Sequence, residues 1–555
     1  MKNMKLYRLI PVLAAALSVA ACTDFDDIQP AGGTLLASQV QETNAVQPSR
    51  ASASFNGMLT NIGKPLQISF SSNRPDNFGF LMMLFCNDLE GADALIADSN
   101  YNWFSVCGEY TSRNANYANP YVRYCSPYNM ISDVNTFLGG FDDNVDDADS
   151  RYMIAQARAI RAYSYLLIAP GFQFVSNKEG LCIPLLSPEI EDFTHNPRAT
   201  VQEVYDVILS DLDYAVENLD GYARPTKANI NKAVALGLRA RAHLDMKEYQ
   251  EAYDDASAAI ELATAAGIRP KTISELQTAL EDGTAFENIN EVDWLWGYDM
   301  TADIAKIFAN ATTSSWLRSF SANGYAPATQ SYTCINKLLY DKIPATDIRK
   351  QWWVDESLKS SLINGLTWNG HPDVANYSDG GDTKLPFLPY TNVKFGCNPI
   401  ATIDNDEDTP LMRIDEMYLI QAECLNSPEL NKAGEAAQVL ENYVKTYRDP
   451  AYSVSGRGLS LADEIWFQRR VELWGEGFGV FDTKRLGKPL VRFHDDEFSS
   501  NISAAFRFNM EANDGWLLLR FPEDELNTNF SIIDNNDGSQ PKTDQNPLLR
   551  DGVTD

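Results

Sequence analysis

The sequence predicts a mostly α-helical protein, in which paired helices form a scaffold and a large irregular half carries a few short strands. Three observations support this fold class. Apolar residues recur at helical spacing in several neighbouring segments. Alanines stand where two of these predicted helices would cross. Two long stretches, residues 262–410 and 476–555, are rich in Gly, Pro, Asn, Asp and aromatic residues, which is typical of loops.

The first predicted helix pair covers residues 151–169 and 200–219. In both segments apolar residues recur at intervals of three and four, which places them on one face of a helix. The second helix has a clear start signal, because Thr200 and Glu203 have the spacing of a capping box. A loop rich in Pro and Gly separates the two helices.

The second pair is predicted within residues 231–261. Ala240, Ala252 and Ala259 would let two antiparallel helices approach closely, and with an aromatic residue at Tyr249 the segment is similar to a tetratricopeptide (TPR) repeat. A third pair is predicted at 411–425 and 432–447. Long irregular stretches separate the pairs, so we expect a helical scaffold that carries large loops rather than a continuous solenoid.

The predicted loops still contain apolar patterns. The stretch EVDWLWGYD, residues 291 to 299, is predicted as a short strand. We expect Trp294 and Trp296 in this stretch to lie in the core, together with Trp466 and Trp474, because all four stand in strand-like or helical apolar patterns.

The first 21 residues have the pattern of a secretory signal peptide. Lys2, Lys5 and Arg8 precede an apolar run at residues 9 to 21 that is too short to cross a membrane and ends in small residues. An export signal of this kind implies that the mature protein works outside the cytoplasm.

Val19-Ala20-Ala21-Cys22 resembles a lipobox, so we expect Cys22 to be the lipid-modified first residue of the mature chain. An ordinary signal peptide that ends near a cysteine is the alternative. Several acyl chains together anchor a protein stably. The acidic residues 23–27 resemble a tag that directs lipoproteins to the outer face of the outer membrane. Residues 22–50 are expected to form a tether, and residues 51–555 a single globular domain.

Composition excludes some classes of function. A net charge of −31 repels phosphate backbones, so we expect no nucleic-acid partner. No apolar run is long enough for a membrane-spanning helix. The eight cysteines lack zinc-type spacing, and we expect most of them to be small buried residues. A disulfide among Cys86, Cys107 and Cys125 remains open.

No catalytic constellation is evident. The chain has no GxSxG, HExxH or phosphate-binding glycine motif, so we expect neither an enzyme nor a cofactor. The acidic segment 404–408 lacks the glycine of a calcium-binding loop, and no metal site is predicted. Charged residues at helical spacing in 413–423 and 469–476 are interpreted as structural ion pairs and solvated faces.

Several segments together resemble the SusD/RagB family of outer-membrane lipoproteins. Each is weak alone, but their order along the chain, after the lipobox, is fairly specific. The segments that carry the resemblance are ARAIRAYSYLLI at 157–168, RATVQEVYDVILSDLDYAVENL at 198–219, the helix pair at 231–261, YTNVKF at 390–395, PLMRIDEMYLIQAE at 410–423, EIWFQRRVELWGEGFGVFDTKR at 464–485, FPEDELNTN at 521–529 and QNPLL at 545–549.

The resemblance implies a fold, a place and a partner. It implies TPR-like helices at 151–261 within an N-terminal part of about 51–261, and a C-terminal part of about 290–555. It implies a non-enzymatic protein on the exterior of the outer membrane that passes a nutrient to a SusC-like, TonB-dependent barrel transporter. The chain departs from the family at Gln468, where an acid is usual, and after the GEG of 475–477, where an arginine is usual.

Candidate ligand residues combine aromatic rings with polar groups. Aromatic rings can stack on the apolar face of a sugar while amides and charged groups bind its hydroxyls. The segment DSNYNWFS, residues 98 to 105, supplies both types of group in a predicted loop. The candidates are Asn100, Tyr101, Asn102, Trp103, Trp316, Arg318, Trp352 and Trp353.

Four functions fit these features to different degrees. A glycan-binding lipoprotein is the preferred interpretation, and a peptide-binding member of the same family is the alternative, because peptide grooves also use aromatic and amide side chains. A surface glycoside hydrolase and a TPR-type scaffold that binds only proteins are further alternatives. Detectable turnover would favour the hydrolase, and binding confined to the helix pairs would favour the scaffold.

The lipobox interpretation yields a direct prediction. Replacing Cys22 by Ala is expected to release the protein from the membrane, because the acylated residue is lost, while the fold and the ligand affinity of the soluble protein stay unchanged. Membrane fractionation and labelling with radioactive fatty acid measure this. Lipid incorporated into the Cys22→Ala protein would contradict it.

Overall fold

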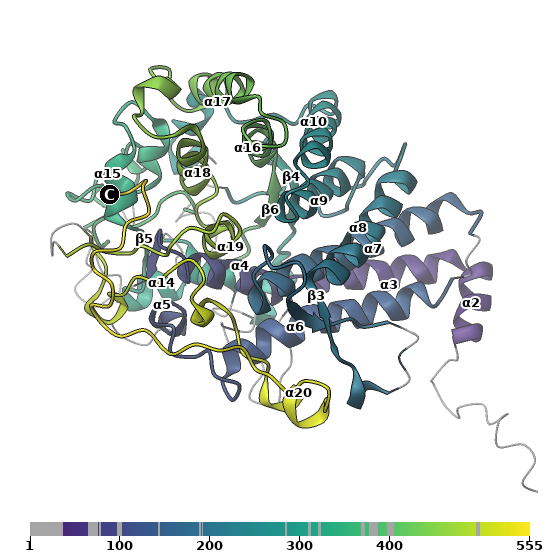
Figure 1. Ribbon diagram of the computed structural model, residues 1–555. Helices are drawn as coiled ribbons and strands as arrows, with labels where there is room; N and C mark the ends of the chain where they lie inside the picture. Colours follow the sequence, from purple (N-terminus) through teal and green to yellow (C-terminus); the bar gives the residue numbers. More distant parts are fainter. Residues whose placement is uncertain are drawn as a thin grey trace, which may run out of the picture.

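The computed structural model (Figure 1) describes residues 37–64, 76, 79–96, 103–141, 145–187, 190, 192–282, 286–308, 312–319, 324–367, 372–376, 387–396, 405–495 and 500–555. The predicted signal peptide at 1–21, Cys22 and the first part of the predicted tether lie outside the described residues. Most of the expected globular domain is described.

Helices dominate this part of the chain, as predicted. The helices are α2 (Ala37–Val46), α3 (Pro48–Asn61), α4 (Gly79–Leu89), α5 (Ser105–Glu109), α6 (Ala118–Leu138), α7 (Ala148–Phe172), α8 (Val201–Asn218), α9 (Lys232–Asp245), α10 (Tyr249–Ala265), α11 (Ile273–Leu276), α12 (Ala302–Phe308), α13 (Thr313–Leu317), α14 (Tyr325–Thr329), α15 (Lys337–Lys342), α16 (Ile414–Leu425), α17 (Ala433–Tyr447), α18 (Leu461–Glu472), α19 (Gly479–Arg485) and α20 (Glu523–Thr528).

The strands are short and pair in twos. They are β1 (Ala94–Ile96), β2 (Leu181–Pro184), β3 (Arg198–Thr200), β4 (Trp294–Tyr298), β5 (Thr333–Ile335) and β6 (Thr409–Arg413). All three pairs, β1–β5, β2–β3 and β4–β6, are antiparallel. Strand β4 confirms the strand predicted around residue 295. Residues 409–413, of which the last three were predicted as the start of a helix, instead form β6 opposite β4.

The predicted helix pairs form a continuous scaffold along one side of the molecule (Figure 1). Helix α7 packs on α8, α8 on α9, α9 on α10, α10 on α16 and α16 on α17. The alanines predicted at the crossing are fully buried at Ala240, Ala252 and Ala259, which allows α9 and α10 to approach closely. Thr200 and Glu203 form the predicted capping box at the start of α8.

The N-terminal helices were not predicted. Residues 37–50 were expected to belong to a tether, but they form α2 and the start of α3. Side-chain amides fix α2 to the end of α6, since Asn44 donates to the Gly140 carbonyl at 2.9 Å. Helix α4 is buried on every side, so it has no polar face and no helical stripe that sequence analysis could detect.

The cysteines of the described part are free thiols. Five of these six residues are buried, as expected for small apolar side chains. Cys86, Cys107 and Cys125 therefore form no disulfide in this structure.

The two halves of the molecule meet at a buried ion network. The side chains of Arg413 and Arg448 are almost inaccessible to solvent, and both bind Asp415 and Glu472. Arg413 also binds Glu476 at 2.8 Å. The prediction of structural ion pairs is confirmed for these residues, but the expectation of solvated faces is wrong, because the partners lie on facing elements rather than on one helix.

Further members extend the network into the irregular half. Lys394 donates to Glu476 at 2.7 Å and to the carbonyls of Glu472 and Trp474. Arg349 binds Glu472 at 3.2 Å, Asp347 at 2.6 Å and the side-chain oxygen of Gln468. The resemblance implies an acid at the position of Gln468, and Gln468 still accepts a hydrogen bond from Arg349. Glutamine at this position therefore lacks the negative charge of an acid but keeps the hydrogen bond to Arg349.

The charges of this network depend on one another. Burial by itself would raise the pKa of Glu472, but the guanidinium groups of Arg448 and Arg413 outweigh burial and hold this pKa well below its ordinary value. Burial also lowers the pKa of Lys394 to about 8. Because the carboxyl group of Glu472 binds protons less well in the folded state, its stabilising effect is present above about pH 4.5 and is lost as the pH falls further.

The network yields a prediction on stability. Glu472→Gln is expected to lower the free energy of unfolding by about 3–5 kcal/mol, because it leaves buried guanidinium groups without a countercharge. Urea denaturation at pH 7 measures this, and below about pH 4 the difference from the unmodified protein should shrink.

Glu441→Gln is the matched control. Glu441 is a partly exposed acid that binds Lys445 at 2.6 Å, and its loss should cost less than about 1 kcal/mol. Equal effects of the two substitutions would contradict the role assigned to the network.

Candidate functional site

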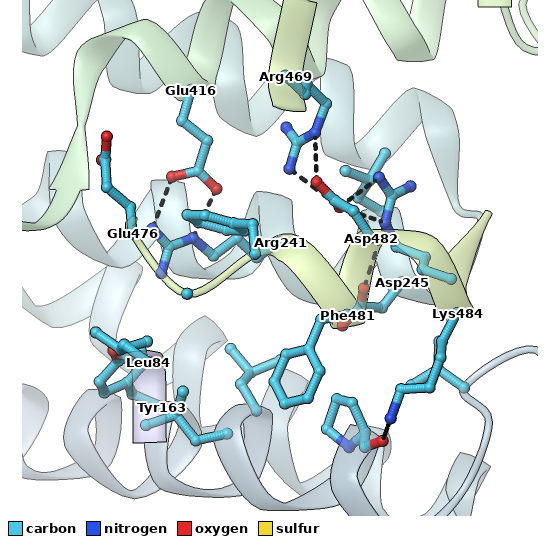
Figure 2. Close-up of a pocket in the computed structure, with 18 of the residues that line it drawn as sticks. Leu84, Tyr163, Arg241, Asp245, Glu416, Arg469, Glu476, Phe481, Asp482 and Lys484 are labelled. Carbon is cyan, nitrogen blue, oxygen red and sulfur yellow. Dashed lines mark hydrogen bonds and ion pairs between the residues drawn. The ribbon is translucent and has the colours of Figure 1, made fainter. Parts of the chain in front are cut away.

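A small cavity lies where the helical scaffold meets the segment around α19 (Figure 2). Its walls combine apolar side chains of α7 and α9 with charged groups. Arg241 binds Glu416 at 2.6 Å, and Arg469 binds Asp482 at 3.0 Å. Lys484 donates to the carbonyl of Pro170. The charges on the wall are therefore largely paired with one another.

Burial shifts the titration of two groups in this wall. It lowers the pKa of Lys484 to about 7, and the charge of Arg113 adds to the effect. It raises the pKa of Asp245 to about 6, although Arg485 opposes this. Such shifts often mark functional sites, but structural ion networks produce them as well.

The volume of this cavity decides against a sugar site. It is about 70 Å³, whereas pockets for small molecules usually measure about 300–1,000 Å³. A space of this size suits a few water molecules at roughly 10–15 Å³ each. The hydroxyl of Tyr163 and Nη1 of Arg469 have no hydrogen-bond partner among the described residues, and water can satisfy both. We therefore treat this cavity as part of the scaffold.

A larger hollow opens in the irregular half. Its volume is about 270 Å³, close to the lower limit for a small-molecule pocket and sufficient for one sugar residue. Both apolar and polar side chains line it. The lining residues are Phe493, His494, Asp495, Ser500, Ile502, Arg507, Asp544 and Pro547. Sequence analysis missed this hollow, because residues 493–507 and 544–547 meet only in the folded chain, where Phe508 forms a parallel bridge with Gln545.

An aromatic cluster lies beside α5. The ring of Phe104 meets Trp316 edge to face at 5.2 Å, and Trp316 stacks on Tyr325 at 4.9 Å with an interplanar angle of 11°. Trp103 precedes this cluster in a turn and is half-buried against the same core. It belongs to the turn just before α5 and so keeps part of its surface at the solvent boundary.

The hollow adjoins α5 and β5, and the aromatic cluster lies beside α5 as well. Asn501, next to the hollow, donates to the carbonyl of Ile335 in β5 at 3.0 Å. Arg492, which precedes Phe493, donates to the carbonyl of Gly108 in α5. Figure 1 shows α5, α14 and β5 together at the loop-rich side. This shared frame makes the region around Trp103 and the hollow the candidate ligand surface.

Four of the predicted ligand residues lie in the core instead. Trp316 and Trp353 have no exposed surface, and Trp352 is 1% exposed. Arg318 is 2% exposed and donates to the carbonyls of Gly396, Phe286 and Asp408. A fully buried ring offers no face to a sugar, so these side chains support the surface and do not form it. Loop context misled the prediction, because the core formed by the scaffold helices continues into the irregular half and includes these tryptophans.

The other predicted ligand residues and the tryptophans predicted in the core have different outcomes. Trp103 is the one predicted ligand residue that the structure describes at the boundary with solvent. Asn100, Tyr101 and Asn102 lie outside the described residues. The four tryptophans predicted in the core are at most 3% exposed, which confirms the prediction for Trp294, Trp296, Trp466 and Trp474.

No metal centre is evident in the described residues. They contain no group of three His, Cys, Asp or Glu side chains that could hold an ion. Asp408, at the end of the acidic segment, accepts hydrogen bonds from the backbone N–H groups of Ile289 and Met300. Burial raises its pKa to about 6. Among the helices described, none is long and apolar enough to cross a bilayer.

Comparison with known families identifies the chain. A family model described as "Starch-binding associating with outer membrane", SusD-like, matches residues 50–244, and the SusD family model, SusD/RagB, matches residues 301–547. The two matches cover both halves of the chain. The protein therefore belongs to the SusD/RagB family, as the resemblance implied.

Solved structures agree on the fold. A SusD-like carbohydrate-binding protein from Bacteroides vulgatus is 22% identical, with a TM-score of 0.66 over 87% of this chain and 97% of that one. A putative sugar-binding protein from the same species is 21% identical, with a TM-score of 0.67 over 88% and 98%. A SusD superfamily protein from Bacteroides thetaiotaomicron is 18% identical, with a TM-score of 0.67 over 88% and 99%.

These similarities confirm the SusD-like helical fold. None of the curated proteins compared with the chain is significantly similar to it.

The assignment of Trp316 to the packed core can be tested. Trp316→Ala is expected to lower the free energy of unfolding by about 3–5 kcal/mol, because a large buried ring is lost and a cavity remains. Thermal and urea denaturation measure this. A loss below about 1 kcal/mol would mean that Trp316 is not part of a packed core.

Proposed function

We propose that this protein is a surface-exposed outer-membrane lipoprotein that binds an oligosaccharide or polysaccharide and delivers it to a SusC-like, TonB-dependent transporter. It acts by capture and release, without turnover of the ligand. Cys22 provides the anchor, and the folded body provides the ligand surface.

The observation that carries this proposal is the family match over both halves of the chain, at residues 50–244 and 301–547. The family description names starch binding and association with the outer membrane. Two structural neighbours are described as carbohydrate- or sugar-binding proteins, which supports a glycan as the ligand. The lipobox and the acidic residues after it support the location.

The candidate surface has the chemistry that a sugar requires. The ring of Trp103 can stack on the apolar face of a pyranose, as aromatic side chains do in sugar sites. The hollow bordered by Arg507 and Asp495 offers a guanidinium and a carboxylate for sugar hydroxyl groups. A hollow of this size accepts one sugar residue at a time, so a longer glycan would extend from it along the surface.

Trp103→Ala is expected to weaken glycan binding by about 1–3 kcal/mol, the loss typical of a stacking platform. Because Trp103 is only half-buried, the substitution Trp103→Ala should lower the melting temperature of the protein far less than Trp316→Ala does. Isothermal titration calorimetry with a glycan that binds the unmodified protein measures the first effect.

Phe193→Ala serves as the matched control, because it removes another aromatic ring, 57% exposed, from a different part of the surface. Its glycan affinity should equal that of the unmodified protein. If Trp103→Ala binds as well as the control, Trp103 is not part of the ligand surface.

The ligand class is tested separately with a panel of glycans and peptides. Binding to one or more glycans supports the proposal. Binding to peptides together with no binding to any glycan would replace the glycan by a peptide as the ligand.

A further inference from the structure

Two neighbouring segments of the surface carry three exposed large apolar side chains. Side chains of soluble proteins rarely expose large apolar groups in clusters, and such clusters often mark docking sites. Here Phe193 is 57% exposed, Phe530 is 63% exposed and Ile533 is 87% exposed. We call these three residues the apolar patch.

Contacts between distant segments hold the apolar patch together. The backbone N–H of Phe530 donates to the carbonyl of Thr194 at 2.8 Å, and Asn529 donates to the carbonyl of Asn196 at 2.7 Å. The ring of Phe530 lies 5.8 Å from the ring of His195. More than 330 residues separate these segments in the sequence, so the fold, not local sequence, brings the two segments that carry the apolar side chains together.

The chain just after Ile533 is fixed to the core through Asn536. Asn536 donates to the carbonyl of Phe172, at the end of α7, at 3.0 Å and to the carbonyl of Leu519 at 2.7 Å. Figure 1 shows α20 at the lower edge of the molecule, close to the segment that leads into β3. A surface held in this way loses little conformational freedom on binding, which favours association.

The rim of the patch is acidic. The segments 192–198 and 523–537 contain six carboxylates, which are Asp192, Glu523, Asp524, Glu525, Asp534 and Asp537. They contain one arginine, Arg198, whose guanidinium donates to the carbonyls of Cys182 and Leu181. Asp192, Asp534 and Asp537 are exposed to solvent.

This charge distribution selects among possible occupants. An anionic lipid surface would be repelled by the carboxylates. A second copy of the chain would bring a second acidic rim against the first, and like charges at an interface are unfavourable. A protein with an apolar centre and a rim of Lys and Arg would be attracted and would bury the three apolar side chains.

We propose that the apolar patch is a docking surface for a protein with an apolar centre and a basic rim, and that the partner transporter provides it. The identity of the occupant rests on the proposed function. The apolar side chains supply the buried centre of the contact, and the carboxylates guide the encounter and set its orientation.

The test uses the full-length lipidated chain and the detergent-solubilised transporter from the same organism. The double variant Phe530→Ser, Ile533→Ser removes apolar groups from side chains that are already exposed, so it should fold normally. Its affinity for the transporter is expected to fall at least about tenfold, the effect of losing central apolar contacts. Biolayer interferometry measures the affinity, and circular dichroism checks the fold.

Leu262→Ser is the matched control, because Leu262 is an exposed apolar residue on α10, at the opposite side of the molecule in Figure 1. Its affinity should be unchanged. The charge reversal Asp534→Lys, Asp537→Lys should slow association and weaken its dependence on salt, since the acidic rim guides the encounter.

The outcomes separate this inference from the proposed function. Unchanged affinity in the Phe530→Ser, Ile533→Ser variant would overturn the inference while leaving glycan capture and delivery intact. Loss of self-association or of vesicle binding in this variant, in place of transporter binding, would overturn the choice of occupant. Failure of the unmodified protein to bind the transporter, with glycan binding retained, would overturn both this inference and the delivery step.

Discussion

Arg413 lies fully buried at the end of β6, and much of the architecture depends on its contacts. It binds Asp415 at 2.9 Å, Glu472 at 3.0 Å and Glu476 at 2.8 Å, so one side chain connects α16, the end of α18 and the loop that follows it. Through Glu472 the contacts continue to Arg448 and Arg349. Buried charges are tolerated only when every partner is present, so this network fixes one relative placement of the scaffold and the irregular half.

This constraint explains how a loop-rich half can carry a defined surface. The long irregular segments contain few strands, and backbone hydrogen bonds alone would hold them weakly. Buried side chains anchor them instead: Lys394 reaches the network, Arg318 donates to three carbonyls, and Arg492 ties the wall of the hollow to α5. With the interior fixed in this way, the surface around Trp103 and the hollow can vary without loss of the fold.

Sequence periodicity predicted the scaffold well, because amphipathic helices with alanine crossings and a capping box leave local signals, as at Thr200 and Ala240. It could not find α4, which is buried on all sides, or the hollow at Phe493, which forms only when distant segments meet. Loop context suggested Trp316, Trp352, Trp353 and Arg318 as ligand residues, yet all four are at most 2% exposed. Their sequence neighbourhood is irregular, but burial depends on contacts far along the chain, so local pattern could not separate core tryptophans from a candidate platform such as Trp103.

The buried charges therefore hold the structure together, and the candidate ligand surface is a small rim of the irregular half. A crystal structure of the mature protein with a bound glycan tests this division most directly. A sugar ring is expected to lie against Trp103 or within the hollow lined by Phe493, Ser500 and Arg507, with the Arg413 network unchanged. A glycan bound on the helical scaffold around α9 and α10, with the surface around Trp103 unoccupied, would contradict it.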